Sequence, residues 1–174
     1  MEIRRVQEAD IETITAIYNW YILNTPITFE IEAINSEEMQ RRVHSKREKF
    51  DWLVGEVNGE VIGYAYYGAY HMRAAYDHTV ETSIYLAQHQ TGKGFGKALY
   101  QSLIDAARER GFREMIGIIA LPNPSSIALH QRFGFEEIGR LKRVGYKFER
   151  YLDVGIWQRS LNSSGVAKRE AEHH

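Results

Sequence analysis

Residues 79–100 read TVETSIYLAQHQTGKGFGKALY, which is a strand, a glycine loop and the start of a helix. The strand alternates, placing Glu81, Ser83 and Tyr85 on one face and the apolar side chains on the other. Small residues between a strand and a helix let backbone N–H groups approach an anion at the positive end of the helix dipole. The stretch therefore predicts an anion site, although the glycines alone fit a flexible connection equally well.

The glycine loop does not match the two common nucleotide-binding motifs. A P-loop has Ser or Thr after its lysine, but Ala98 follows Lys97 here. The dinucleotide-binding motif has a third glycine at the position of Leu99. ATP and NAD are therefore disfavoured as ligands.

The remaining sequence predicts further strands and helices on both sides of this stretch. Asn58-Gly59 suits a type I′ turn and predicts a hairpin, Asp10 is a suitable N-cap, and Gly111 and Gly134 are suited to end helices. Hydrophobic spacing predicts strands at 2–6, 52–57, 60–67, 79–86, 115–121, 136–141 and 151–157, and helices at 11–22, 36–49, 97–110 and 125–133. This order predicts an α/β fold.

Length and composition are those of one globular domain. The chain has 174 residues, of which 44% are hydrophobic and 26% charged. A net charge of -1 lacks the positive field of a nucleic-acid binder. No apolar run is long enough for a membrane helix, and MEIRRVQEAD lacks the apolar segment of a secretion signal. We expect a cytoplasmic protein without nucleic-acid or membrane partners.

The sequence also limits the chemistry that is available. There are no cysteines, so disulfides and a thioester on the enzyme are excluded. The seven histidines show no familiar zinc spacing, and we expect no metal. Residues 1–161 are predicted to form the domain. We expect residues 162–174 to be a disordered tail whose last residues are a cloning remnant.

The glycine loop and three other stretches resemble one enzyme family. The loop residues 92–99 after strand 84–86 are similar to the pyrophosphate loop of the GNAT acetyltransferases. The resemblance covers about residues 2–160. It becomes more specific at AYDHTVE (75–81), at residues 121–130, and at GYK (145–147) with DVGIWQR (153–159). There the chain resembles the phosphinothricin and methionine sulfone or sulfoximine N-acetyltransferases. Thr91 stands where the family usually has Gln or Arg, and it retains its backbone N–H.

The resemblance implies a GNAT fold, namely a single domain with a mixed, mostly antiparallel sheet flanked by helices. It implies acetyl-CoA as the cosubstrate. The GNAT sheet is splayed beside residues 84–86, which frees backbone groups for the acetyl carbonyl and the pantetheine. Asn123 is either a coenzyme A contact through its amide or a cap for the helix that follows it. The implied contact residues are Ile84, Tyr85, Leu86, Thr91, Gly92, Lys93, Gly94, Phe95, Gly96 and Asn123.

Acetyl transfer to an amine requires a base, because an aliphatic amine has a pKa of about 10 and attacks only when neutral. Glu81 is the candidate base, acting directly or through a water, and its alternative is a solvated strand residue. The resemblance places His130 near the reaction centre as a second proton acceptor or as an orienting group. Its alternative is a half-buried helix residue. No tyrosine lies on that helix, so the acid for the leaving thiolate is unassigned.

The acceptor site requires a cation if the substrate carries an anionic or sulfonyl group. Arg73 is the candidate, and its alternative is a surface arginine stacked on tyrosine. Phe29 resembles the apolar wall of the family, or is a core residue. The predicted substrate-binding residues are Phe29, His71, Met72, Arg73, Tyr76, Glu81, Thr82 and Ser83.

We therefore expect acetylation of a small amino-acid-like amine by direct transfer in a ternary complex. The alternatives are a GNAT enzyme that acts on a peptide N-terminus, a polyamine or an aminoglycoside, and a coenzyme A-binding protein without turnover. A homodimer is expected from the resemblance and from Tyr151 and Trp157 on the last strand, since aromatics are enriched at interface centres. Both aromatics could instead fill the monomer core.

Overall fold

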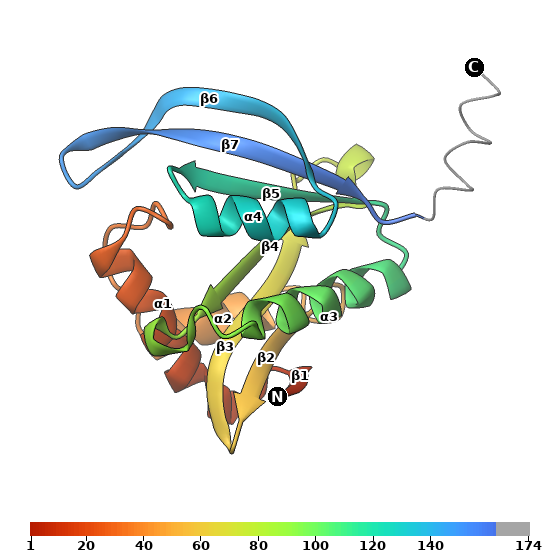
Figure 1. Cartoon of the computed structure of the whole chain (residues 1–174). Coiled ribbons are helices and arrows are strands. Elements are labelled where there is room, and N and C mark those ends of the chain that lie inside the picture. Colours follow the sequence, from red (N-terminus) through yellow and green to blue (C-terminus); the bar gives the residue numbers. More distant parts are fainter. Residues whose placement is uncertain (163–174) are drawn as a thin grey trace.

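The computed structural model describes residues 1–162, which form one seven-stranded sheet with helices on both faces (Figure 1). The strand order is β1-β2-β3-β4-β5-β7-β6, and the only parallel pair within residues 1–162 is β4 with β5. The strands are β1 (Glu2–Arg5), β2 (Trp52–Val57), β3 (Glu60–Ala69), β4 (Thr79–Leu86), β5 (Glu114–Leu121), β6 (Glu136–Lys147) and β7 (Arg150–Ser160). The helices are α1 (Ile11–Asn24), α2 (Ser36–His44), α3 (Phe95–Glu109) and α4 (Pro124–Arg132), with short 3-10 turns η1 (Glu8–Asp10), η2 (Ala74–Tyr76) and η3 (Gln88–Gln90). The predicted mixed, mostly antiparallel sheet is confirmed.

Turn residues determine most of these boundaries. Asn58 and Gly59 both adopt positive φ, at 52° and 80°, and confirm the predicted hairpin between β2 and β3. Gly111 and Gly134 also have positive φ where α3 and α4 end. The side chain of Asp10 precedes α1 as predicted, but it accepts from Gln7 N and pairs with Arg4 instead of capping the helix.

The sheet buries a separate cluster of apolar residues on each face. Helix α3 packs over β2, β3 and β4 on one face, where the larger cluster includes Leu99, Leu103 and Trp157. Helices α1 and α2 cover the other face, where Ile14 and Met39 pack against the strands. No helix within residues 1–162 is long and apolar enough to cross a membrane.

Several predicted element boundaries were wrong. Strand β3 continues to Ala69 and not to residue 67, and β7 runs from Arg150 to Ser160 and not from 151 to 157. The second helix ends at His44 and not at residue 49, because Lys46 adopts a φ of 56° that a helix cannot accommodate. Strand β6 continues to Lys147 and not to residue 141, since two register shifts let it follow β7 further. Helix α3 begins at Phe95, directly after Gly94, and not at Lys97. The predicted tail lies outside the described residues, apart from residue 162.

Candidate active site

Strands β4 and β5 separate halfway along their length. Their pairing runs from Thr79 opposite Glu114 to Thr82 opposite Gly117, and stops there. Beyond that point β4 stays paired with β3, and β5 stays paired with β7 as far as Leu121. The sheet therefore opens into a gap whose two sides are strand edges.

The backbone of β4 presents free polar groups to this gap. Just after β4, Ala87 N donates to a carbonyl of β3 at 2.8 Å. In an antiparallel pair, the backbone N–H and C=O groups of successive residues point alternately toward and away from the partner strand. The backbone groups of the odd-numbered residues of β4 therefore point toward β3, and those of the even-numbered residues point toward β5. Ile84 and Leu86 lie beyond the last β4–β5 pair. Tyr21 Oη donates to Leu86 O at 2.6 Å. The N–H and C=O of Ile84 and the N–H of Leu86 remain directed into the gap.

Tyr85 differs from its two neighbours. Its backbone groups point to β3 in the same alternation, opposite Tyr64. Its ring packs in an aromatic cluster on the α1 side, 5.1 Å from the ring of Tyr18 and 5.3 Å from that of Tyr21. The predicted backbone contacts from residues 84–86 are therefore available from Ile84 and Leu86 only.

The gap contains a small polar cavity, which we call the seam cavity. Its volume is about 60 Å³, and it adjoins a larger cleft of about 580 Å³ that shares Ile27 and Asn123 with it. The seam cavity is lined by Ile27, Thr82, Ser83, Ile84, Tyr85, Tyr100, Ile118, Ile119, Ala120, Asn123, Ser126 and His130. The two form one depression that leads from the glycine loop into the split sheet.

The glycine loop forms the wall of the larger cleft. Gly92 and Gly94 adopt left-handed φ values of 77° and 84°, and no atom lies within 4 Å of where a Cβ would stand on either. Gly94 is the N-cap of α3 and offers no side chain to the first helical N–H groups, which stay available. Thr91 Oγ1 donates to Gln88 O at 3.2 Å. The loop thus combines open space with unpaired donors, as an anion site requires.

Four other predicted contact residues lie at or beside this cleft. Lys93 is exposed, and its ammonium contacts Gln90 Oε1 at 3.2 Å. Phe95 and Gly96 form the first turn of α3, and Gly96 lines the cleft where a Cβ would come 3.5 Å from Leu86. Asn123 Oδ1 accepts from Ser126 N at 3.2 Å, which caps α4. The Asn123 side chain is therefore a cap that also borders both cavities.

His130 is buried in the wall of the seam cavity, and both ring nitrogens have partners. Nδ1 lies 2.7 Å from Ser126 O, which can only accept, so Nδ1 carries the proton. Nε2 then accepts from the Tyr100 hydroxyl at 2.9 Å. Burial lowers the pKa of His130, which favours this neutral form. A Cβ on Gly117 would lie 2.6 Å from Nε2, so the histidine packs directly on the β5 backbone.

Glu81 lies on the opposite face of β4 from His130. It is paired with Gly68 of β3, and it is half-buried on the face that carries Ser83 and Tyr85. Burial raises the pKa of the Glu81 carboxyl, while the nearby His71 opposes the shift. A carboxyl with a raised pKa is a better proton acceptor once ionised, as a general base requires.

The predicted acceptor residues do not all share one surface. Thr82 points to the α3 side, where its buried hydroxyl faces that of Tyr100, so it lines the seam cavity instead. Met72 is 84% exposed, and Arg73 is also exposed in the segment between β3 and β4. The rings of Tyr70, His71 and Tyr76 pack together in that segment, with His71 and Tyr76 centroids 5.1 Å apart.

Phe29 lies in the segment of residues 25–35 between α1 and α2, which we call the strap. The strap is held on the face of the sheet that carries Glu81 and Ser83, because Tyr18 bonds to it and makes an edge-to-face ring contact with Tyr85. Phe29 is 40% exposed and contacts Gly145 of β6. It is therefore not a core residue.

Two site residues were missed from sequence. Tyr100 sits on the apolar stripe of α3, where a hydroxyl among Leu99 and Leu103 was the available signal. Lys147 belongs to the GYK stretch (145–147), but the sequence of a β-strand does not show that a lysine in it is buried. In the structure Lys147 is only 5% exposed. Trp157 is 2% exposed in the core, so only Tyr151 of the two predicted interface aromatics is at the surface.

Comparisons with known proteins agree with this geometry. The family model described as an acetyltransferase (GNAT) domain matches residues 3–156. Phosphinothricin N-acetyltransferase of Streptomyces viridochromogenes is 36% identical over 92% of this chain and 88% of its own length. The L-methionine sulfoximine/L-methionine sulfone acetyltransferase of Pseudomonas aeruginosa is 38% identical over 95% and 97%. A Sinorhizobium meliloti phosphinothricin acetyltransferase, solved in complex with AcCoA, superposes with a TM-score of 0.90 at 40% identity, covering 92% and 88%.

Proposed function

The chain belongs to the GNAT acetyltransferase family and is an N-acetyltransferase, and from this premise we propose its substrates. We propose that it transfers acetyl from acetyl-CoA to the α-amino group of an amino acid of the phosphinothricin, methionine sulfone or methionine sulfoximine type. The observation that carries the proposal is the separation of β4 from β5 between the glycine loop and the Glu81 face. The names of the relatives support the acceptor class.

The residues at the cleft fit acetyl-CoA. Gly92 and Gly94 leave room for a pyrophosphate beside the first turn of α3. Ile84 N–H is the free strand donor for a carbonyl oxygen that gains negative charge during transfer. When bound, acetyl-CoA supplies a thioester, whose carbonyl carbon is open to attack by an amine.

The chain supplies the proton transfer. Glu81 removes a proton from the ammonium of the acceptor, directly or through a water, so that the nitrogen lone pair becomes free. The chain has no cysteine, and we propose direct transfer between two bound substrates without an acyl-enzyme. His130 keeps the Tyr100 hydroxyl in place at the seam cavity. We propose that His130 also acts near the reaction centre, as a second proton acceptor or as an orienting group.

Arg73 is proposed to bind the acidic or sulfonyl end of the acceptor. Arg73 is exposed and follows His71 by two positions, and His71 is the residue that lowers the pKa of Glu81 against the effect of burial. A fork of N–H donors suits a tetrahedral group with several oxygens and gains little from a thioether. Phosphinothricin and methionine sulfone should therefore be acetylated far better than methionine.

The test is an assay of purified protein with acetyl-CoA and a panel of amines, following the release of free thiol. We expect phosphinothricin and methionine sulfone to give the highest kcat/KM. Preference for spermidine or a peptide N-terminus would contradict the acceptor class. Absence of thiol release with every amine would favour a binding protein without turnover.

We also propose that the chain is a homodimer and that residues 1–161 form the whole transferase domain. Strand β6 is a 12-residue edge strand, and long apolar edges promote association. Its side chains Ile138, Val144 and Tyr146 are 55–58% exposed, and Tyr151 on β7 is 68% exposed. A second copy would cover them. A light-scattering mass near 20.2 kDa at micromolar concentration would contradict the dimer.

A further inference from the structure

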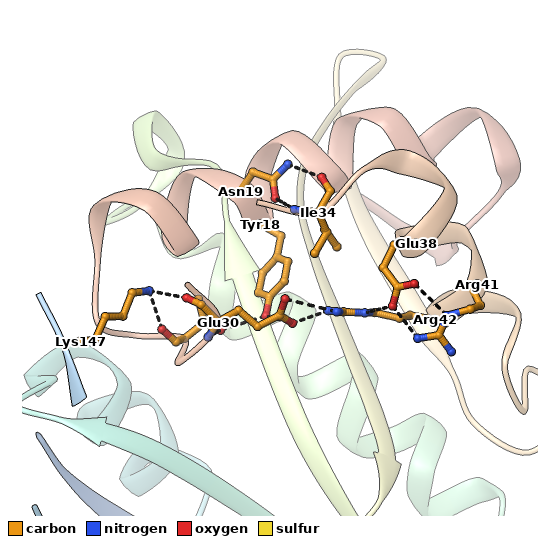
Figure 2. A network of polar contacts seen from close by, with 9 residues as sticks. Tyr18, Asn19, Glu30, Ile34, Glu38, Arg41, Arg42 and Lys147 are labelled. Atoms are coloured by element: carbon orange, nitrogen blue, oxygen red, sulfur yellow. Dashed lines mark hydrogen bonds and ion pairs between the residues drawn. The ribbon is translucent and has the colours of Figure 1, made fainter. Parts of the chain in front are cut away.

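A buried lysine joins the strap to strand β6. Lys147 is 5% exposed, and its ammonium donates to Thr28 O at 2.8 Å and to Glu30 O at 2.7 Å. Among residues 1–162, no carboxylate forms an ion pair with it, because the Glu30 carboxylate contacts Arg42 and Tyr18 instead (Figure 2). The Lys147 ammonium also lies over the Phe148 ring, 5.2 Å from the ring centroid. A buried charge without an ion-pair partner adds little to folding stability. Folding stability alone therefore does not account for the contact between Lys147 and the strap.

Phe29 lies between the two residues whose carbonyls Lys147 binds. Its ring sits on Gly145, two residues before Lys147 and so on the same side of β6. A Cβ on Gly145 would lie 2.4 Å from Phe29 Cζ, so only glycine permits this approach. Residues 28–30 of the strap thus contact Gly145 and Lys147, two residues on the same side of β6.

The other side of the strap is attached to α1 and α2. Tyr18 Oη lies 2.9 Å from Thr28 Oγ1 and donates to Glu30 Oε1 at 2.8 Å, while Arg42 pairs with the Glu30 carboxylate (Figure 2). Asn19 bonds to the backbone N–H and C=O of Ile34, at 2.9 and 2.8 Å. The strap side chains are therefore fixed to the helices that cover β2, β3 and β4.

The strap consequently connects the two parts of the sheet that separate at the gap. Its helices pack on the part ending at β4, and Lys147 belongs to the part beyond β5. Ile27 of the strap lines both the seam cavity and the larger cleft. Along the described chain, Lys147 supplies the only side-chain hydrogen bonds between β6 and the strap. The hydrogen-bonded attachment of the strap to β6 thus depends on this one side chain.

We propose that Lys147 is a positioning residue for the acceptor site: by holding the strap on β6 it keeps Phe29 against Gly145 as one wall of that site. The predicted effect on acceptor KM rests on the proposed function, whereas the attachment of the strap by Lys147 does not. Lys147 touches neither substrate, and it acts through Phe29. Removal of the ammonium should loosen the strap and widen the acceptor site, while the glycine loop and the first turn of α3 stay intact.

The first test is the Lys147→Met variant, with Lys142→Met as the matched control, since Lys142 is exposed on the same strand. Amide hydrogen exchange of residues 25–35 should be at least tenfold faster in Lys147→Met than in the wild type or the control. The thermal midpoint should fall little, because an apolar side chain replaces a buried charge. Unchanged exchange in a folded variant would overturn the proposal, and this arm needs no activity.

The second test is kinetic. In Lys147→Met, the KM for the acceptor should rise about tenfold, while kcat and the Kd for acetyl-CoA change less than about twofold. Equal losses in all three quantities would indicate a general structural role and overturn the proposal. If the wild type acetylates no amine, the proposed function fails, whereas the exchange result still decides whether Lys147 holds the strap.

A double-mutant cycle gives an independent check. Gly145→Ala should raise the acceptor KM by itself, because its Cβ displaces the Phe29 ring. In a Phe29→Ala background the same change should have little further effect, since the clash is gone. Additive effects of the two substitutions would show that Phe29 and Gly145 do not act together, against the proposal.

Discussion

The two ends of the site are constructed differently. At the cleft, a continuous stretch from Ile84 to Lys97 supplies almost everything through its backbone: a free strand edge, two left-handed glycines and the start of α3. The proposed acceptor end would be assembled from side chains of four separate segments, represented by Phe29, Arg73, Glu81 and Lys147. A backbone site should tolerate side-chain changes that an assembled site does not. Substitutions at each end can test this difference.

The largest expected effect comes from Glu81→Gln. Without its base, the enzyme should lose roughly 10²–10⁴-fold in kcat, while the Kd for acetyl-CoA stays within about twofold. Steady-state kinetics and calorimetry measure the two quantities. Glu114→Gln on β5 is the control, since Glu114 is also partly buried and should leave kcat unchanged. Wild-type turnover of Glu81→Gln across pH 6–9 would exclude Glu81 as the base.

The pH dependence of the same residue sharpens the comparison. Glu81 acts as a base only when ionised, and burial raises the pKa of its carboxyl. An ordinary glutamate has a pKa of about 4.3. As the pH decreases, the kcat/KM of the wild type should therefore begin to fall at a pH above the one expected for an ordinary glutamate. This acidic decline should disappear from the residual activity of Glu81→Gln.

The next effect is expected at the other end, from Gly94→Val. Valine places atoms in the open space beside α3, and a φ of 84° is strained for it. The Kd for acetyl-CoA should rise roughly tenfold or more, about 1.4 kcal/mol or above, whereas hydrogen exchange of the strap stays the same. Gly59→Val is the control, because Gly59 has a φ of 80° in a remote turn. Equal affinity in the folded Gly94→Val variant would refute the loop as the phosphate site.

The smallest effect is expected from Arg73→Ala. The KM for methionine sulfone should rise about five- to tenfold, in keeping with about 1 kcal/mol or slightly more for a charged hydrogen bond at an exposed position. Methionine provides the internal control, because it lacks the oxygens and its KM should not change. A parallel rise for both amino acids would assign Arg73 a role unrelated to the sulfone.

The same difference explains what the sequence could predict. The strand at 79–86, the glycine loop and the hairpin at Asn58-Gly59 depend on local patterns, and the structure confirms their positions. The burial of Lys147, the partnership of Tyr100 with His130 and the contact of Phe29 with Gly145 join residues 30 or more positions apart. No local pattern contains such contacts. Thr82 was assigned to the acceptor site although strand alternation places it opposite Glu81.

The separation of β4 from β5 also has a consequence for protein engineering. The two parts of the sheet meet through only four residue pairs, Thr79–Thr82 opposite Glu114–Gly117. Substitutions on the outer face of β6, for example at Val144 or Tyr146, therefore leave the hydrogen bonds around the glycine loop untouched. Libraries made there can vary the proposed dimer contact at little risk to the cosubstrate cleft. The strap positions matched to Lys147 and Gly145 are the ones such libraries should hold constant.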